Sequence, residues 1–362
     1  MVKYECTKCK KEFKQKGHYE FHMGRKTPCI TEDRIRELVK EELKLENRPS
    51  VVDLFSGAGG LTWGFVENKY KVLFGVEHDK DAAKTYSANY THPMLNEDIT
   101  KLNPDELVLK YGKCDVIIGG PPCQGFSMAG KRNSKDPRNS LFMDYLRFVK
   151  AFQPRFFLLE NVPGILTMKT EASEYVTDII KAEVQSLGYS LKHAKLYAPD
   201  YGIPQKRRRV IFLAWRSDQN EPNYPVPTHT KENYVPCKSI LLAKEEVPEK
   251  YYHSEKMING FFERLKKNKE SKKGFGAQFI KENEPCYTLS ARYYKDGCDA
   301  LVRYSDTEIR KLTEREAARI QTFPDTFVFP VSSVQTYKQI GNAVPCKLGF
   351  VIANKLADMF QK

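Results

Sequence analysis

The chain has 362 residues, which is enough for two or three domains with a sizeable core. Lysine and arginine number 59 against 46 acidic residues, and the net charge of +13 favours a polyanionic partner, nucleic acid first. No apolar stretch is long enough to span a bilayer, no signal peptide is evident, and the nine scattered cysteines form no disulfide framework. We therefore expect a soluble, intracellular protein with reduced cysteines.

The first 30 residues carry cysteine and histidine at zinc-finger spacing. Cys6 and Cys9 form a C-x2-C pair, His22 follows after x12, and Cys29 follows after x6. Fingers of the ββα type use C-x2-C-x12-H with a somewhat closer last ligand, so Cys29 implies a slightly extended helix end. We predict a zinc finger over residues 1–30 with these four ligands, and His18 is the alternative ligand.

The role of this finger has three interpretations. Phe13 and Tyr19 fall at its core positions, and its helix would present Gln15, His18 and Phe21 to DNA bases. Phe21 is a poor reader of base edges, so nonspecific DNA affinity and a protein contact explain the finger equally well. The finger is compatible with two origins of the protein, a large DNA virus or an unusual microbe.

The rest of the chain divides into a linker and two domains. Residues 31–48 are predicted to form a charged helix, capped by Thr31, with Ile35, Leu38 and Val39 on one stripe. From residue 49, short apolar runs alternate with helical stretches, which predicts an α/β fold with a mainly parallel, doubly wound sheet over 49–215 and 330–362. In residues 216–329 apolar runs and helical stretches no longer alternate, and these residues are predicted to form a smaller, irregular domain. The runs are VVDLFS, KVLFGVEHD, CDVIIGG, RFFLLENV and RRVIFLAW.

A glycine-rich turn follows the first of these runs. In VVDLFSGAGG, three glycines would let the backbone approach a ligand near a helix N-terminus. The pattern is GxGG, and a nicotinamide oxidoreductase would need GxGxxG. Glu77 ends the next run, 24 residues after Asp53, where a carboxylate suits the hydroxyls of a ribose, and Asp98 would then lie near an adenine amino group. The three glycines are Gly57, Gly59 and Gly60.

Two later runs end in residues that suit covalent chemistry. Cys123 follows CDVIIGG in the segment GGPPCQGFS, where Pro121 and Pro122 fix the backbone before the sulfur. The alternative interpretation is a buried structural cysteine. Glu160 ends RFFLLENV, where it is either a helix cap or an acid that shares a crevice with Cys123.

The segment QKRRR precedes the last run. Alternation would direct Arg207 and Arg209 to one face and Lys206 and Arg208 to the other. The second pair suits a solvated basic surface. The first pair is predicted to contact phosphate or base.

Together these segments resemble the DNA cytosine-5 methyltransferase family over roughly residues 50–362. Six motifs occur in the family's order: DLFSGAGGLTWGF, GGPPCQGFS, ENV, QKRRR, RKLTEREAARIQTFPD and GNAVP. The resemblance implies S-adenosylmethionine as cofactor, duplex DNA as substrate, and a cytosine flipped out of the helix for reaction. It also implies that residues 216–329 contain the target-recognition region.

The resemblance assigns roles to individual residues. The Cys123 thiolate would add to C6 of cytosine, Glu160 would hydrogen-bond N3, Arg209 would brace the base or Glu160, and Arg207 would contact phosphate or base. Glu97 stands where many members have glycine. The cofactor contacts implied are Phe55, Gly57, Gly59, Gly60, Glu77, Asp98, Pro121 and Asn342, and the DNA contacts are Gln124, Ser127, Gln205, Thr288 and Arg292.

Further expectations concern partners and rival functions. The enzyme is expected to act as a monomer in the cytoplasm or nucleoid, or in a host compartment if viral, with a cognate restriction endonuclease as a potential partner. One rival is an RNA cytosine-5 methyltransferase, because one branch of the family carries Cys-Phe-Thr where this chain has Cys286-Tyr287-Thr288. The other rival is a DNA-binding regulator without catalysis, which the intact Cys123 and Glu160 oppose.

Overall fold

A computed structural model describes residues 3–7, 9, 11–25, 29, 35–37, 48–122, 137–170, 173–271 and 276–361, and in 137–170 it describes side chains from residue 141 onward. Two compact units are present, Met1–Arg48 and Pro49–Lys362. Cys123, Gln124 and Ser127 lie outside the described residues, as do Thr31, Leu38 and Val39. No helix in the described part of the chain is both long and apolar enough to cross a membrane.

The first unit contains a small ββα arrangement. Strands β1 (Tyr4–Glu5) and β2 (Glu12–Phe13) pair antiparallel, and α1 (Lys16–Met23) follows. Tyr19 on α1 packs against Tyr4 and Phe13, with ring centroids 6.0 and 6.1 Å apart. Among the described residues of this unit only Cys6 and His22 are buried.

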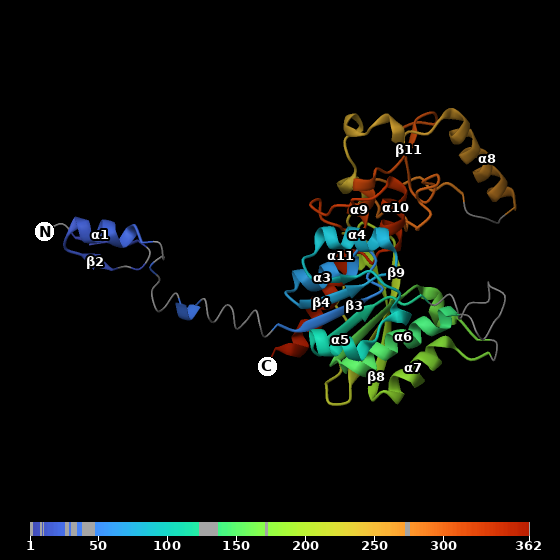
Figure 1. Ribbon diagram of the computed structural model, residues 1–362. Coiled ribbons are helices and arrows are strands. Elements are labelled where there is room, and N and C mark those ends of the chain that lie inside the picture. Colours follow the sequence, from blue (N-terminus) through green and yellow to red (C-terminus); the bar gives the residue numbers. More distant parts are fainter. Residues whose placement is uncertain are drawn as a thin grey trace. The chain divides into compact units, whose positions relative to one another are not determined.

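The second unit is built on a seven-stranded sheet in the order β5-β4-β3-β6-β7-β9-β8 (Figure 1). The first five of these strands run parallel, whereas β9 is antiparallel to both of its neighbours. The strands are β3 (Ser50–Leu54), β4 (Lys71–Val76), β5 (Met94–Leu95), β6 (Val116–Gly119), β7 (Phe156–Asn161), β8 (Tyr189–Tyr197) and β9 (Arg208–Arg216).

β8 was not among the predicted apolar runs, and β9 is the antiparallel member of a sheet predicted to be mainly parallel. β8 is an edge strand that pairs with β9, and polar residues interrupt its apolar ones in the partly buried sequence YSLKHAKLY. It therefore lacks the continuous apolar run that marks an interior parallel strand. The chain reverses direction between β8 and β9, so β9 runs antiparallel to β8.

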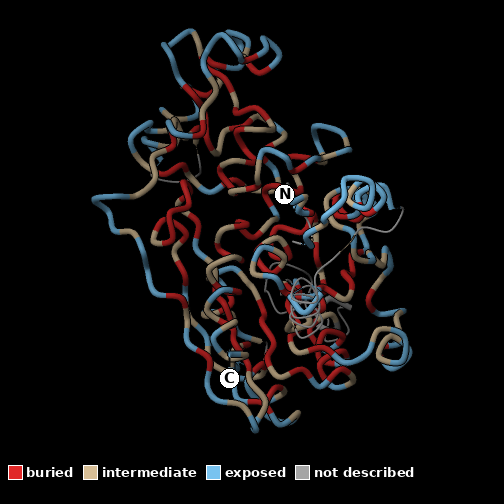
Figure 2. The backbone as a smooth tube through the Cα atoms, turned by 90° about the vertical axis from the view of Figure 1, so that its left-hand side faces the viewer, coloured by how far each residue is buried: buried red, intermediate tan, exposed pale blue. Residues whose placement is uncertain are grey.

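Alternating side chains from the strands pack into two cores on opposite faces of the sheet. Ile117 packs with α5 (Pro104–Tyr111), α6 (Pro137–Phe152) and α7 (Val176–Ser186). Its neighbours Val116 and Ile118 pack on the other face with α3 (Gly60–Glu67) and α11 (Cys346–Ala357). Figure 2 shows these buried segments in the interior, with exposed turns around them. The C-terminal helix thus returns to the same sheet as the first strand.

A close approach of two helices completes the second face. A Cβ added at Gly64 on α3 would lie 2.1 Å from the carbonyl carbon of Gly349 on α11. We expect Gly64→Ala to lower the free energy of unfolding by about 1–3 kcal/mol, because one of the two backbones must move. Urea unfolding measures this change. The control is Gly260→Ala, where an added Cβ meets nothing within 4 Å, and an increase of about 0.5–1 kcal/mol is expected.

Residues between β9 and α11 form a second, less regular lobe. Its elements are α8 (Glu255–Ser271), the hairpin of β10 (Leu301–Arg303) and β11 (Ile309–Lys311), α9 (Glu314–Ile320) and α10 (Ser333–Asn342). Arg310 and Glu316 form a fully buried ion pair at 2.8 Å that joins the hairpin to α9. The lobe's core includes Tyr337 and Ile340 of α10 as well as Cys346, so it is continuous with the end of the chain. α4 spans Lys80–Asn89, and short 3-10 turns are η1 (Ile99–Lys101), η3 (Pro163–Thr167), η4 (Ala198–Tyr201), η5 (Cys237–Ile240), η6 (Lys244–Glu246), η7 (Glu249–Tyr251) and η8 (Asp358–Phe360).

Candidate active site and metal cluster

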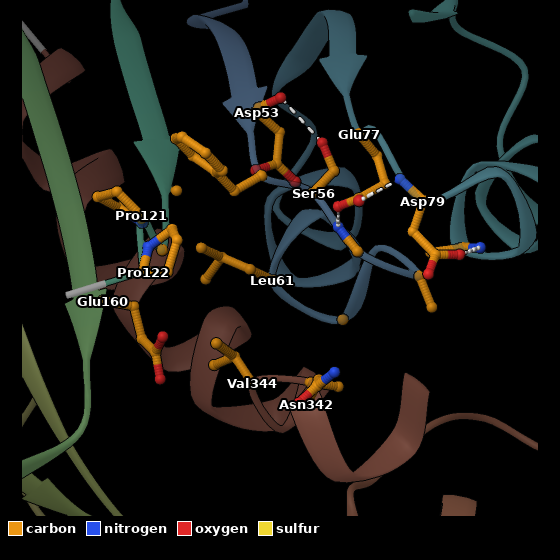
Figure 3. A pocket seen from close by; sticks show the side chains of 18 of the residues that line it. Asp53, Ser56, Leu61, Glu77, Asp79, Pro121, Pro122, Glu160, Asn342 and Val344 are labelled. Atoms are coloured by element: carbon orange, nitrogen blue, oxygen red, sulfur yellow. Dashed lines mark hydrogen bonds between the residues drawn. The ribbon is translucent and has the colours of Figure 1, made fainter. Parts of the chain in front are cut away.

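A cavity of about 780 Å³ opens at the carboxyl ends of the parallel strands. This is where doubly wound sheets bind ligands, because the loops that follow the strands diverge there. In Figure 3, Glu77 and Asp79 lie on one side of the cavity, Pro121 and Glu160 on the other, and Leu61 between them. The predicted site residues that line it are Phe55, Gly57, Gly60, Glu77, Asp98, Pro121, Glu160, Arg209 and Asn342.

The turn after β3 requires glycine at two positions. Gly59 has a φ of +91°, and a Cβ there would lie 2.3 Å from the Tyr90 ring, whose hydroxyl donates to the Gly59 carbonyl at 2.6 Å. A Cβ on Gly60 would lie 2.5 Å from the carbonyl oxygen of Val344. The turn is therefore held tightly between α4 and the GNAVP segment, and it begins α3 at the cavity wall.

Two carboxylates follow the neighbouring strand ends. Glu77 is buried, and its Oε2 accepts from the Gly57 N–H at 2.9 Å while its Oε1 accepts from the Asp79 N–H at 2.8 Å. Asp98 accepts from the Thr100 N–H at 2.9 Å and from the Thr100 hydroxyl at 2.8 Å, and these bonds lower the pKa of its carboxyl. Both carboxylates are fixed at the cavity by backbone donors.

Glu97, where glycine was the family expectation, also lines the cavity. Its carboxylate accepts from the Asp98 N–H at 2.9 Å and lies 3.5 Å from the Lys101 ammonium. These contacts lower the pKa of Glu97. The substitution therefore adds a second fixed carboxylate beside Asp98.

A fourth carboxylate, Asp53, lies buried beneath the glycine turn. It accepts a short hydrogen bond from the Thr62 hydroxyl, which is itself 3.3 Å from the Tyr86 hydroxyl. Burial raises the pKa of Asp53 to about 7, with a smaller increase from the Glu77 carboxylate, although the Thr62 bond opposes both.

This pKa predicts a pH-dependent stability. Between about pH 4 and pH 7 the folded chain keeps a proton on Asp53 that the unfolded chain has released, so stability falls as pH rises. Asp53→Asn removes this titration and can still accept the hydrogen bond from Thr62. At pH 8 we expect the variant to avoid up to about 4 kcal/mol of the decrease in unfolding free energy that wild type shows as pH rises. Urea unfolding of both proteins at about pH 5 and pH 8 measures the difference. An identical pH dependence of the two proteins would contradict the assignment.

Glu160 and Arg209 form an ion pair at the edge of the cavity. The Arg209 Nε lies 2.5 Å from the Glu160 Oε1, and the two side chains are 12% and 14% exposed. Strand pairing places them together, because β7 and β9 are neighbours with Glu160 opposite Ile211. A Cβ on Gly120 would lie 2.9 Å from the Glu160 Oε2, so a side chain at this position would make the carboxylate shift.

The base of the segment that carries Cys123 is tied to this pair. The Asn161 side-chain amide donates to the Pro121 carbonyl at 3.1 Å. Pro121 is buried and lines the cavity, two residues before Cys123. Asn161 was part of the ENV motif in the sequence, but no signal there indicated this contact.

The structure corrects the prediction that Arg207 and Gln205 contact DNA. Arg207 is 1% exposed and donates to the carbonyl oxygens of Leu289, Gly341 and Ala343 at 3.0–3.1 Å. Burial lowers the pKa of its guanidinium well below the ordinary value. Gln205 is also buried and donates to Gln321 at 2.8 Å. The alternation argument failed because these residues precede β9 and lie in a turn covered by later segments.

Two other predicted DNA contacts, Thr288 and Arg292, fall in the described part of the chain. Thr288 and Arg292 are exposed, and the Thr288 hydroxyl donates to the Lys206 carbonyl at 2.7 Å. Asn342, a predicted cofactor contact, is exposed at the end of α10. The sequence analysis did not identify the α10 residues Gln335, Lys338 and Gln339, which also line the cavity. Their helical spacing before GNAVP was the available signal.

The first unit brings its four predicted ligands together. The ligand atoms of Cys6, Cys9, His22 and Cys29 all lie within 4.8 Å of one another. The Cys6 and Cys29 sulfurs are 3.4 Å apart, and the Cys9 sulfur is 3.2 Å from His22 Nε2. His18 is exposed and does not belong to this cluster.

The cavity lies at the strand ends, with a glycine turn after the first strand and an acidic residue after the second. This arrangement defines a class of doubly wound enzymes that bind a nucleotide-type cofactor. Residues 50–358 match the family of C-5 cytosine-specific DNA methylases, and the chain belongs to this family. The resemblance seen in the sequence is confirmed. The protein is a DNA cytosine-5 methyltransferase, and the family implies S-adenosylmethionine as methyl donor.

Individual relatives agree with this membership. The type II methyltransferase M.DdeI of Desulfomicrobium norvegicum is 34% identical over 378 residues, covering 86% of this chain and 89% of that protein. M1.ScrFI of Lactococcus lactis subsp. cremoris is 36% identical over 334 residues, covering 91% and 83%. The structure of S. pombe Dnmt2 methyltransferase has a TM-score of 0.70 at 21% identity, covers 86% of this chain and 99% of that one, and confirms the α/β fold.

Proposed function

We propose that this enzyme methylates C5 of a cytosine flipped out of duplex DNA, through a covalent bond between Cys123 and C6. The observation that carries the proposal is the Glu160–Arg209 pair at the cavity edge, which lies against Gly120, the residue directly before the Pro121–Pro122 turn. Substrate access requires flipping, because C5 and C6 are enclosed in a stacked duplex.

The proposed steps account for each bond that forms and breaks. The Cys123 thiolate would add to C6, and Glu160 would donate to N3, where negative charge develops as the ring becomes an enamine. C5 would then take the methyl group from the sulfonium of the cofactor, and the electron pair of the broken S–CH3 bond would stay on that sulfur. A base, for which water suffices, removes the C5 proton, and the electrons of that bond expel the sulfur. Arg209 holds the Glu160 carboxylate in position throughout.

The cavity residues fit S-adenosylmethionine, which supplies a methyl group on a positively charged sulfonium. Carboxylates outnumber cations around the cavity, with Glu77, Glu97 and Asp98 among them, and this excess suits a cationic ligand. Glu77 would accept from ribose hydroxyls and Asp98 from the adenine amino group. Phe55, Gly57, Gly59, Gly60, Pro121 and Asn342 would form the remaining contacts.

The biological setting follows from the relatives. M.DdeI and M1.ScrFI are named type II methyltransferases, so we propose a role in a restriction-modification system with a cognate endonuclease. Recognition of the target sequence would belong to residues 216–329, with Thr288 and Arg292 toward the DNA. A monomer stays the expectation from the sequence.

The cluster of Cys6, Cys9, His22 and Cys29 suits a structural zinc ion. Three thiolates and one imidazole are a donor set that zinc prefers, and the short separations of their sulfur and nitrogen atoms agree with tetrahedral coordination. The ion would hold the ββα unit together and take no part in methyl transfer.

The test is transfer of labelled methyl from S-adenosylmethionine to duplex DNA and, separately, to transfer RNA. Wild type is expected to label DNA, and Cys123→Ala is expected to abolish labelling. Labelling of RNA alone would move the enzyme to the RNA branch. Tight DNA binding without labelling of either substrate would favour a regulator.

A further inference from the structure

Arg208, the first residue of β9, is an exposed cation that the proposed reaction does not use. Its neighbours in the QKRRR segment have carboxylate partners. The Lys206 ammonium lies 2.6 Å from Glu284, and Arg209 pairs with Glu160. Arg208 has no carboxylate within 4.0 Å in the part of the chain that the structure describes. Its charge is therefore available to a partner outside the chain.

The Arg208 guanidinium is nevertheless held in place by aromatic rings. Its central carbon lies 4.4 Å from the ring centroid of Tyr197, the residue opposite it on β8. Tyr234 contacts the Tyr197 ring edge-on at 6.1 Å, and its hydroxyl donates to Asp200 at 2.6 Å. A guanidinium that lies over a ring keeps its N–H donors at its own edge, where they can bind a phosphate in bidentate fashion. Arg208 is thus oriented before any ligand arrives.

The position of β9 places Arg208 beside the reaction site. β9 runs antiparallel to β7, so it begins at the edge of the sheet where β7 ends and the cavity opens. Arg209 lines the cavity, and the alternation along a strand directs Arg208 to the opposite face of the sheet. A duplex that delivers one nucleotide to the cavity must keep its phosphates outside the mouth, close to this strand end.

A second cation lies on the same face. Lys195 precedes Tyr197 by two residues on β8, so both side chains point to the face that Arg208 occupies. Lys195 is exposed, and no carboxylate among the described residues pairs with it. A lysine on an edge strand also prevents pairing with another sheet. That role requires no neighbouring arginine stacked on a tyrosine, whereas a phosphate contact uses both cations.

We propose that Arg208 and Lys195 form a contact surface for the phosphate backbone of the duplex DNA that enters the cavity. The contacts hold the DNA in position and read no sequence, because phosphates are the same at every base pair. This inference rests on the proposed function, because it takes duplex DNA with a flipped-out cytosine as the substrate.

The test is the salt dependence of DNA binding by the full-length protein. The probe is a mixed-sequence duplex, and its dissociation constant is measured from about 50 to 200 mM salt. Arg208→Gln is expected to weaken binding about three- to tenfold at the low-salt end. The slope of log affinity against log salt concentration should fall by about 0.9, the value for one phosphate contact. Lys195→Gln should behave alike, and the double variant should lose about 1.8.

Two variants control for net charge and for geometry. Arg216→Gln changes the net charge equally, but Arg216 lies at the other end of β9, about 25 Å away, and bonds to Asp218 at 2.7 Å. Its salt slope should equal that of wild type. Arg208→Lys should restore the slope, because the slope counts neutralised phosphates, but lysine lacks the guanidinium fork and should restore only part of the affinity.

Two results would overturn the contact surface. An unchanged salt slope with a lowered Tm in Arg208→Gln would mean that the arginine only stabilises the pairing of β8 with β9. An equal loss of slope in Arg216→Gln would mean that net charge alone is responsible. If wild type transfers no methyl group to DNA, the proposed function itself fails. If wild type methylates DNA and the slopes of all variants agree, only the contact surface is wrong.

Discussion

Glu160→Gln is expected to lower kcat for DNA methylation by about 10²–10³-fold, the usual cost of removing one preorganised group that stabilises developing charge. Glutamine keeps the shape of the side chain, but it has no acidic proton to pass to N3 when thiolate addition places negative charge on that nitrogen. The affinity for DNA should change little, because the side chain is only 14% exposed and contacts one base. Single-turnover kinetics and a binding titration measure the two quantities separately.

Arg209→Gln is expected to cause a loss of similar size, because it leaves the Glu160 carboxylate without the ion pair at 2.5 Å. The double variant should be little worse than either single one, since residues that act as a unit are strongly non-additive. Additive losses would show that the two side chains act independently. Arg216→Gln is the matched control on the same strand, because its bond to Asp218 at 2.7 Å lies on the surface, and activity should stay at the wild-type level.

The strand ends explain why much of the site was predictable. Glu77 and Glu160 each close an apolar run, and parallel strands bring their carboxyl ends to one edge of the sheet. The glycine turn was equally visible, because positive φ and close packing leave few other residues possible at Gly59. These features could therefore be predicted from local sequence patterns.

The errors arose where distant segments decide the environment. Arg207 bonds to Leu289, Gly341 and Ala343, which lie 82 to 136 positions away in the chain. No local pattern shows that these segments cover the turn before β9. Gln339 is a further case, because its buried amide has no hydrogen-bond partner among the described residues, and a helical sequence pattern does not show whether such a residue is buried or solvated.

Removal of the proposed zinc ion is also expected to have a large effect, which concerns the first unit alone. Among its described residues only Cys6 and His22 are buried, so the unit has almost no apolar core. Units of this size usually need a metal or disulfide, and structural zinc contributes about 10–16 kcal/mol in finger peptides. Chelation, or Cys9→Ser, is therefore expected to unfold α1 in the full-length chain.

Hydrogen exchange of the full-length protein measures this unfolding. Amides of α1 should lose protection without metal, whereas those of β3 and β6 should keep it, because Pro49–Lys362 is a separate compact unit with its own cores. His18→Ala, outside the cluster, is the control and should retain one zinc per chain. Persistent protection of α1 after complete chelation would mean that Tyr4, Phe13 and Tyr19 hold the unit without metal, and the zinc assignment would then fail.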